Sequence, residues 1–193
     1  LGVLSLQREA SGNPWTLLPV KMFANLAAGY GGQGTLCGAL GVGSQFFNLV
    51  AFDEQKTFVK MTDELFQWYS RTVFPTSRFD DICYYPGQVQ RLAKSPLCHV
   101  SVSQWTLAAG SEVTSKQKKD RCAKVTGEVM IRTVEMLNDY VDGRYTQREF
   151  PFKEENAACL SCHGADDMWH DKDGMNNQQG KMTCNLCHSH LFK

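Results

Sequence analysis

Hydrophobic residues recur every three or four positions along two long stretches of the chain, which is the spacing of one helix face. The stretch from Thr57 to Phe74 predicts a helix that Pro75 ends, because a proline disfavours helical geometry in the residue before it. The stretch from Val113 to Tyr140 predicts a longer helix that Gly143 closes. Cys122 falls on the apolar, and therefore buried, face of this second helix.

Two further segments carry a broader apolar pattern. Pro14 to Tyr30 predicts the first helix of the chain, followed by a Gly-Gly pair. Gly34 to Phe52 contains four glycines and Cys37, and predicts a Gly-rich helix whose backbone can approach another helix or a cofactor closely. Between Ser77 and Gly110 the period is lost, which predicts turns and loops.

After Phe152 the chain becomes rich in Asn, Asp, Gly, Gln, Cys and His and shows no period. We find no stretch that predicts a long strand. The expected fold class is therefore mainly α, with a helical body over residues 1–152 that holds four scattered cysteines, and an irregular C-terminal tail over residues 153–193.

The tail contains two copies of the motif Cys-x-x-Cys-His, which is the attachment signature of c-type haem. Two thiols add to the porphyrin vinyl groups, and the histidine after the second thiol ligates the iron. The motifs predict two covalent haems c in this tail. The residues expected to bind them are Cys159, Cys162, His163, Cys184, Cys187 and His188.

A zinc site is the alternative interpretation, because the two Cys-x-x-Cys pairs have nearly the spacing of a zinc ribbon. Disulfides are a further alternative. Neither gives a reason for a histidine directly after both pairs, so we favour haem. If the tail binds zinc instead, the protein is a colourless interaction module.

The second axial position of each iron must come from the remaining histidines. His190 lies two residues beyond His188, and two residues span at most about 7 Å, so His190 must serve a different haem, in this chain or in a partner subunit. His170 is the second candidate and His99 the reserve. Three methionines are weaker candidates, which would raise the haem potential: Met168, Met175 and Met182.

The remaining cysteines, Cys37, Cys83, Cys98 and Cys122, allow three interpretations. They can form two disulfides, remain buried free thiols, or ligate an iron–sulfur cluster. Their scattered spacing favours disulfides or free thiols over a cluster, because it lacks the compact Cys-x-x-Cys pattern of ordinary ferredoxins.

Twenty basic and twenty acidic residues give a formal net charge of zero, so composition suggests neither nucleic acid nor an anionic membrane as partner. The apolar stretch from Leu40 to Phe52 is interrupted by polar residues, so we expect no membrane insertion. The start of the chain lacks the pattern of a signal peptide, as in a mature chain after its removal. Because bacteria attach haem c outside the cytoplasmic membrane, we expect a periplasmic location.

The segment Gly31-Gly-Gln-Gly-Thr-Leu-Cys37-Gly-Ala-Leu-Gly41, the later single cysteines and the two haem motifs together resemble the split-Soret cytochrome c family. The body is similar to a redox-associated domain marked by a Gly-Cys-Ala-x-x-Gly stretch, although the order here is Cys37-Gly38-Ala39. The resemblance implies a homodimer, two stacked bis-His haems per subunit, an axial ligand donated across the dimer, and a non-haem iron–sulfur site at Cys37, Cys83, Cys98 and Cys122.

Two haems with both axial positions filled by protein leave no iron site for a substrate, so the expected function is electron transfer between redox partner proteins. The alternative is a haem enzyme. If one iron is five-coordinate, it can bind and reduce a small molecule such as nitrite, hydroxylamine or peroxide.

Overall fold

The computed structural model describes residues 2–151, 154–163 and 181–188, and most of these lie in helices. The fold is mainly α, as the sequence predicts. Its helical elements are α1 (Gly2–Ser11), η1 (Trp15–Leu17), η2 (Val20–Leu26), α2 (Ala27–Tyr30), α3 (Gly38–Val50), α4 (Thr57–Arg71), η3 (Ser77–Phe79), α5 (Cys98–Ala109), α6 (Lys116–Val141), η4 (Glu154–Asn156), α7 (Ala157–His163) and α8 (Asn185–His188).

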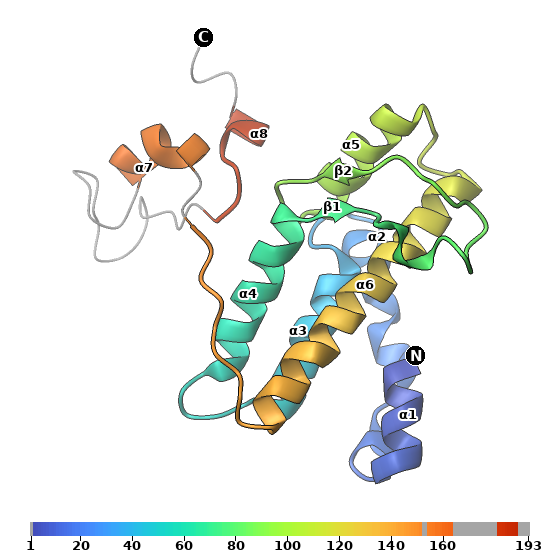
Figure 1. Cartoon of the computed structure of the whole chain (residues 1–193), viewed down its shortest axis with the longest axis vertical. Coiled ribbons are helices and arrows are strands. Elements are labelled where there is room, and N and C mark those ends of the chain that lie inside the picture. Colours follow the sequence, from blue (N-terminus) through green and yellow to red (C-terminus); the bar gives the residue numbers. More distant parts are fainter. Residues whose placement is uncertain (1, 152–153, 164–180, 189–193) are drawn as a thin grey trace.

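Helices α3, α4 and α6 pack against one another and form the core of the body (Figure 1). They meet closely at Gly43 of α3, where an added Cβ atom would lie 2.7 Å from Thr133 Oγ1 and 2.8 Å from Leu65 Cδ2. Only glycine permits this approach, which agrees with the expectation from the Gly-rich segment. The predicted helices over 34–52, 57–74 and 113–140 are these three.

The prediction of one helix from Pro14 to Tyr30 is wrong. The structure breaks this segment into η1, η2 and α2, because Pro19 between the first two elements lacks an amide hydrogen and cannot continue a helix. Ala28 and Gly29 then take left-handed backbone angles inside α2, with φ of 53° and 72°. The apolar pattern correctly predicted that Leu26 is buried, but its prediction of a continuous helix was wrong.

The segment 77–110 is not all loop, because it ends in helix α5. Alternating Val and Ser between Val100 and Ser103 obscured the helical period, and β-branched residues lower helix propensity. Gly110 ends α5 in the left-handed conformation that commonly terminates helices. The same segment also supplies β2 (Arg91–Leu92), which pairs antiparallel with β1 (Val73–Phe74), so the helix predicted to reach Phe74 ends at Arg71.

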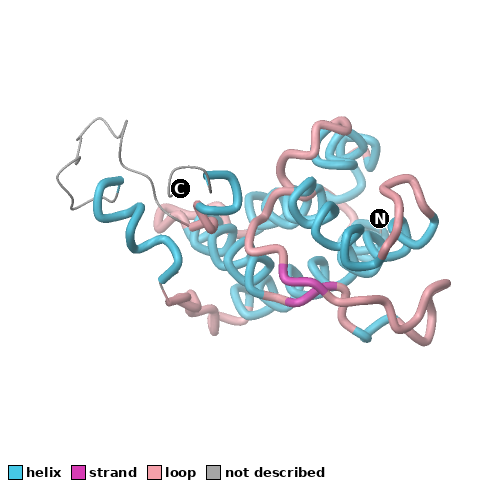
Figure 2. The backbone as a smooth tube through the Cα atoms, turned by 90° about the horizontal axis from the view of Figure 1, so that it is seen from above, coloured by secondary structure: helices cyan, strands magenta, loops and turns pink. Residues whose placement is uncertain are grey.

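After α6 the chain runs back along α4 and enters the tail. Helices α7 and α8 of the tail lie beside the C-terminal end of α4, away from α1 (Figures 1 and 2). Glu64, a buried carboxylate of α4, holds the segment that leads from α6 to the tail by accepting hydrogen bonds from Tyr145 Oη and the Arg148 amide, both at 3.0 Å. Arg132 of α6 pairs with the same carboxylate at 2.7 Å. The tail is therefore not wholly irregular: both Cys-x-x-Cys-His motifs lie on helical turns.

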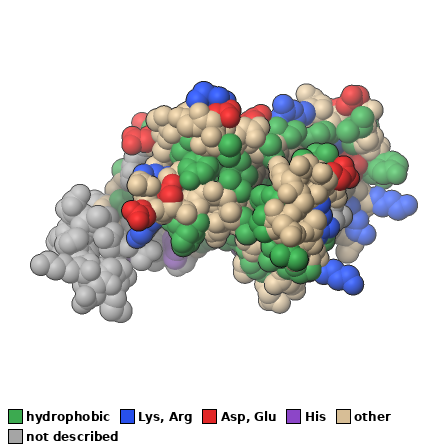
Figure 3. Space-filling model, turned by 90° about the horizontal axis from the view of Figure 1, so that it is seen from below, with side chains coloured by type: hydrophobic (Ala, Val, Ile, Leu, Met, Phe, Trp, Pro, Cys, Tyr) green, Lys and Arg blue, Asp and Glu red, His purple; other side chains and the backbone are tan. Residues whose placement is uncertain are grey.

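Within the part of the chain that the structure describes, every helix is too short or too polar to span a bilayer. On the face seen in Figure 3, hydrophobic side chains gather in the middle, and acidic and basic side chains both occur around them.

Candidate redox sites

The first candidate site is a cavity in the body, and a short antiparallel contact creates it. Leu36 and Leu97 form an isolated β-bridge. Around it the Cys37 amide donates to the Pro96 carbonyl at 2.9 Å, and the Cys98 amide donates to the Thr35 carbonyl at 2.6 Å. The two cysteines therefore occupy diagonal positions on one face of this contact, which keeps their side chains within several ångströms of each other.

Both cysteines also lie at helix N-termini. Cys37 is the N-cap residue of α3, and Cys98 is the first residue of α5. The aligned backbone dipoles place partial positive charge at both positions.

Cys122 of α6 completes a set of three half-buried cysteines that line one cavity of about 1020 Å³. The sequence predicts Cys122 on the buried face of its helix, and the structure leaves it half-buried in the wall of this cavity and not in a closed core. We call this space, bounded by Cys37, Cys98 and Cys122, the thiol cavity. Apolar side chains of α1, η2 and α3 form much of its remaining wall.

Positive charge borders the thiol cavity. Arg121 and Lys118 of α6 line it, and Arg121 is only 2% exposed. The Arg121 guanidinium donates to Ser101 Oγ at 2.7 Å and lies 4.0 Å from the Cys122 sulfur. A buried guanidinium has to be balanced by negative charge or strong acceptors, and thiolates bound to a metal centre would supply that balance.

The phenol of Tyr69 is a second buried polar group on this wall, and it donates to Ser101 Oγ at 2.9 Å. Burial raises the pKa of Tyr69 well above its ordinary value, and the thiol of Cys37 raises it further. Tyr69 is therefore a neutral hydrogen-bond donor at every physiological pH.

The three thiols influence one another. Burial raises the pKa of Cys98 above its ordinary value of 9.0, and the neighbouring Cys37 and Cys122 raise it further, whereas Lys118 and Arg121 oppose the rise. Without a ligand, Cys98 is thus held as a neutral thiol, and a cation that binds thiolates has to displace its proton.

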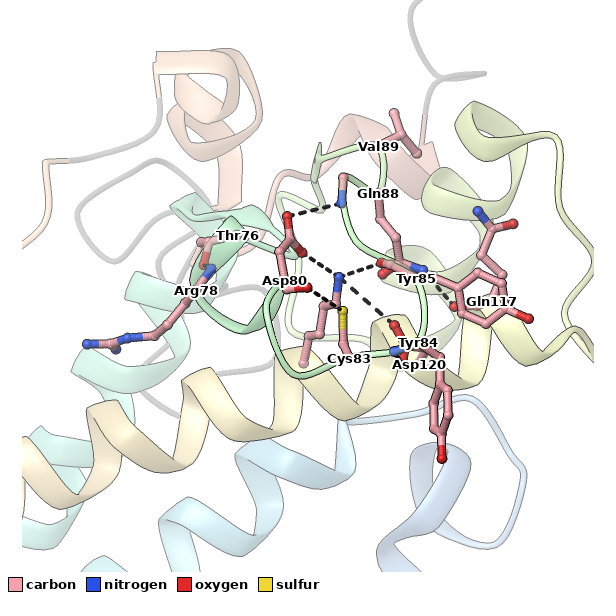
Figure 4. Close-up of polar contacts among 12 residues, drawn as sticks. Thr76, Arg78, Asp80, Cys83, Tyr84, Tyr85, Gln88, Val89, Gln117 and Asp120 are labelled. Carbon is pink, nitrogen blue, oxygen red and sulfur yellow. Dashed lines mark hydrogen bonds and ion pairs between the residues drawn. The ribbon is translucent and has the colours of Figure 1, made fainter.

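Cys83 does not line the thiol cavity. It lies on the loop after η3, where its thiol donates to the Asp80 carbonyl at 3.7 Å (Figure 4). This loop packs on Lys124, and Lys124 follows Cys122 by two residues, about 200° around the helix axis. Cys122 and the loop that carries Cys83 therefore lie on different faces of α6.

Lys124 fixes that loop. Its side chain is 2% exposed, and its ammonium group pairs with Asp80 at 2.7 Å and donates to the Tyr85 carbonyl at 2.7 Å. Burial opposes the charge, but hydrogen bonds with Asp80 and Cys83 outweigh it, so the pKa of Lys124 is raised. The Lys124 hydrogen bond in turn lowers the pKa of Asp80, with help from the Gly87 amide.

No described cysteine forms a disulfide, and the described side chains of Cys, His, Asp and Glu do not converge in threes on a point where one metal ion could sit. A cluster with several irons differs from a single ion, because its cysteine ligands bind different irons. The three thiols around one cavity have the donor type that holds iron–sulfur clusters. His99 borders the same cavity, and its Nδ1 lies 3.1 Å from the Gly34 carbonyl.

The second candidate site is the tail. Both motifs include a helical turn, and residues three and four apart on such a turn face the same way, which is how the first cysteine and the histidine of each motif are spaced. In the second motif the Cys187 and His188 amides both bond to the Cys184 carbonyl, at 3.2 and 3.1 Å. Cys187, His188 and His163 are exposed, so a porphyrin can reach them. The donors thus fit covalent haem.

Several predicted ligands lie outside the described residues: His170, His190, Met168 and Met175. Met182 is described, and its sulfur accepts a hydrogen bond from Ser95 Oγ at 3.6 Å. His99 belongs to α5 at the thiol cavity.

The hydrophobic pattern did not identify four side chains that border the thiol cavity. It predicted Tyr69 as a core residue and gave no role to the others, Ser101, Lys118 and Arg121. The only signal in the sequence was that Arg121 adjoins Cys122. Asn156, whose amide oxygen accepts a hydrogen bond from the Cys184 amide at 2.9 Å, carried no signal in the sequence.

Comparison with known proteins supports a redox role. Residues 3–136 match the family described as "Putative redox-active protein (C_GCAxxG_C_C)". The chain is 32% identical to the split-Soret cytochrome c of Desulfovibrio desulfuricans (strain ATCC 27774) over 97% of its own length, and spans 66% of that protein.

A solved structure of the Desulfovibrio protein, described as having a novel iron centre, superimposes with a TM-score of 0.79. The superposition covers 96% of this chain and 75% of the other, at 31% sequence identity. The chain belongs to the C_GCAxxG_C_C redox family and is a homologue of split-Soret cytochrome c.

Proposed function

We propose that the protein is an electron carrier with two haems c in its tail and an iron centre in the thiol cavity. The observation that carries this proposal is the pair of Cys-x-x-Cys-His motifs, each held on a helical turn with its histidine exposed. Similarity to a split-Soret cytochrome c along nearly the whole chain supports it.

In each haem site the two thiols fix the porphyrin edge, and His163 or His188 supplies the proximal nitrogen. We infer that His170 and His190 provide the distal nitrogens, since His99 lies in the body at the other site. Bis-His iron is low-spin and has no open position, so it exchanges electrons without binding a substrate.

The iron centre is the second part of the proposal. The related Desulfovibrio protein has a novel iron centre, and the thiol cavity is where this chain gathers cysteines. We assign Cys37, Cys98 and Cys122 as its ligands, in a cluster and not as a single ion. The cationic Arg121 and Lys118 offset the charge of the thiolates.

We further propose that the protein works in the periplasm as a homodimer and passes electrons between partner proteins, without binding nucleic acid or entering a membrane. Attachment of haem c outside the cytoplasm supports the location. Exposure of His163, Cys187 and His188 supports a partner or second subunit that covers the haems, because a short tail cannot bury two porphyrins.

The first experiment is an absorption spectrum of the native protein, oxidised and reduced, with a mass of the denatured chain. A mass raised by two haems and a purely low-spin spectrum are the expected results. A high-spin component would favour the alternative, a reductase with one five-coordinate iron. An unmodified mass without a Soret band would overturn the proposal and leave the zinc module.

The iron centre is tested by comparing Cys98→Ser with Cys83→Ser. We expect Cys98→Ser to lose the non-haem iron, and Cys83→Ser to retain it, because Cys83 faces another side of α6. Loss of iron in both variants would show that all four cysteines hold the cluster. Retention in both would place the iron elsewhere.

A further inference from the structure

The described tail contains two buried side chains, Asn156 and Thr183, and both are polar. Asn156 is fully buried, directly before α7, and Thr183 is 4% exposed, directly before Cys184. Since the described tail contributes nothing to the hydrophobic core cluster, its internal geometry depends on the hydrogen bonds of these residues.

Asn156 bonds to the second motif through both ends of its amide. Its Nδ2 donates to the Met182 carbonyl at 2.6 Å, and its Oδ1 accepts from the Cys184 amide at 2.9 Å. The backbone of Cys184 and Met182 cannot shift relative to Asn156 without breaking one of these buried bonds. Breaking either costs the free energy of a buried hydrogen bond.

Cys159 follows Asn156 by three residues at the start of α7, about 4.5 Å along a helix axis. The first cysteine of one motif and the first cysteine of the other are thus joined through a single amide and less than one helical turn. Beside it, Thr183 Oγ1 donates to Glu155 Oε2 at 3.1 Å. We propose that Asn156 is a positioning residue that sets the distance and angle between the two haems, an inference that rests on the proposed dihaem function.

A different set of contacts holds the tail on the body. Gln67 Nε2 of α4 donates to the Lys181 carbonyl at 3.2 Å, and the Lys181 ammonium pairs with Asp63 at 2.7 Å. These contacts fix where the second motif docks but do not reach the first motif. Gln67→Met, of nearly the same shape, is therefore the matched control.

The test compares Asn156→Leu, Asn156→Asp and Gln67→Met in the haem-loaded protein. Leucine keeps the volume and removes both hydrogen bonds, whereas aspartate keeps the acceptor for the Cys184 amide and loses the donor to Met182. The readout is the Soret circular dichroism couplet, which reports the spacing and angle of two neighbouring haems. We expect Asn156→Leu to lose most of the couplet, Asn156→Asp to lose part of it, and Gln67→Met to retain it.

Hydrogen exchange of the Cys184 amide is a second readout that needs no haem signal. We expect exchange to be about fivefold faster or more in Asn156→Leu and close to the wild-type rate in Asn156→Asp. If Asn156→Leu is too unstable to purify, Asn156→Asp alone still decides the question through its couplet.

A lower melting temperature with an unchanged couplet in the Asn156 variants would overturn the inference and leave a structural role only. Equal loss of the couplet in Gln67→Met would also overturn it, because docking on the body would then set the haem geometry. A wild-type mass with fewer than two haems would instead refute the proposed function.

Discussion

The thiol cavity and the tail bring cysteines together in opposite ways. The tail motifs are local, since each set of ligands lies within five consecutive residues and one helical turn suffices to align them. The thiol cavity draws Cys37, Cys98 and Cys122 from three separate helices. Local sites tolerate changes elsewhere in the chain, whereas a site assembled by packing depends on the fold around it.

The two regions also differ in what stabilises them. The body has a large apolar core between α3, α4 and α6, while the described tail buries only two polar side chains. We therefore expect that cofactor attachment orders the tail, and that the body folds without its cofactor. If so, loss of a haem from the tail should leave the body and its iron centre unchanged.

The largest expected effect is that of the double variant Cys184→Ser/Cys187→Ser. Serine hydroxyls do not form the thioether bonds, so the variant should lose one of the two haems by mass while keeping its non-haem iron. The matched variant Cys159→Ser/Cys162→Ser should lose the other haem. Loss of the non-haem iron in either variant would show that the two regions do not assemble independently.

The next effect is that of Lys124→Met, which removes the buried cation between Asp80 and the loop carrying Cys83. Because the substitution removes both the ion pair with Asp80 and the hydrogen bond to the Tyr85 carbonyl, we expect it to lower the free energy of unfolding, measured by chemical denaturation, clearly more than its matched control does. Lys119→Met, at an exposed position of the same helix, should change it by less than about 0.5 kcal/mol. Similar values for both variants would refute the role assigned to Lys124.

A smaller effect is expected from Arg121→Gln at the thiol cavity. Removal of a buried positive charge destabilises the more negative, reduced state of the iron centre, so its potential should fall, on the order of 50 mV, which is about 1 kcal/mol. Potentiometric titration measures this shift, and the haem potentials should change less. Arg78→Gln, at an exposed position, is the control. A rise in potential would contradict the assigned charge balance.

The smallest effect concerns Asp80 in acid. Its pKa lies below the ordinary 3.8 because Lys124 favours the carboxylate, so its stabilising contribution is complete above pH 3.8 and is lost as the pH falls through the lowered value. Asp80→Asn should therefore weaken the acid dependence of unfolding below pH 4 and leave the dependence between pH 5 and 8 unchanged. An acid limb identical to that of the wild type would exclude this pair as its source.

Where the apolar period was uninterrupted, the sequence predicted the fold well. Helices α4 and α6 follow their patterns to within a few residues, because their apolar stripes face one core. The errors lie where local chemistry competes with that pattern. Pro19 broke the first predicted helix, and the Val-Ser alternation concealed α5, whose N-terminus carries Cys98.

By itself, the sequence determined the two haem motifs, because thiol and imidazole spacing within five residues needs no partner from elsewhere in the chain. Only the tertiary structure decided which body cysteines belong together. The bridge between Leu36 and Leu97 brings Cys37 to Cys98, and the turn of α6 places Cys122 with them while Cys83 meets another face. Long-range pairing and helix rotation set these positions, and neither is a property of any short stretch of sequence.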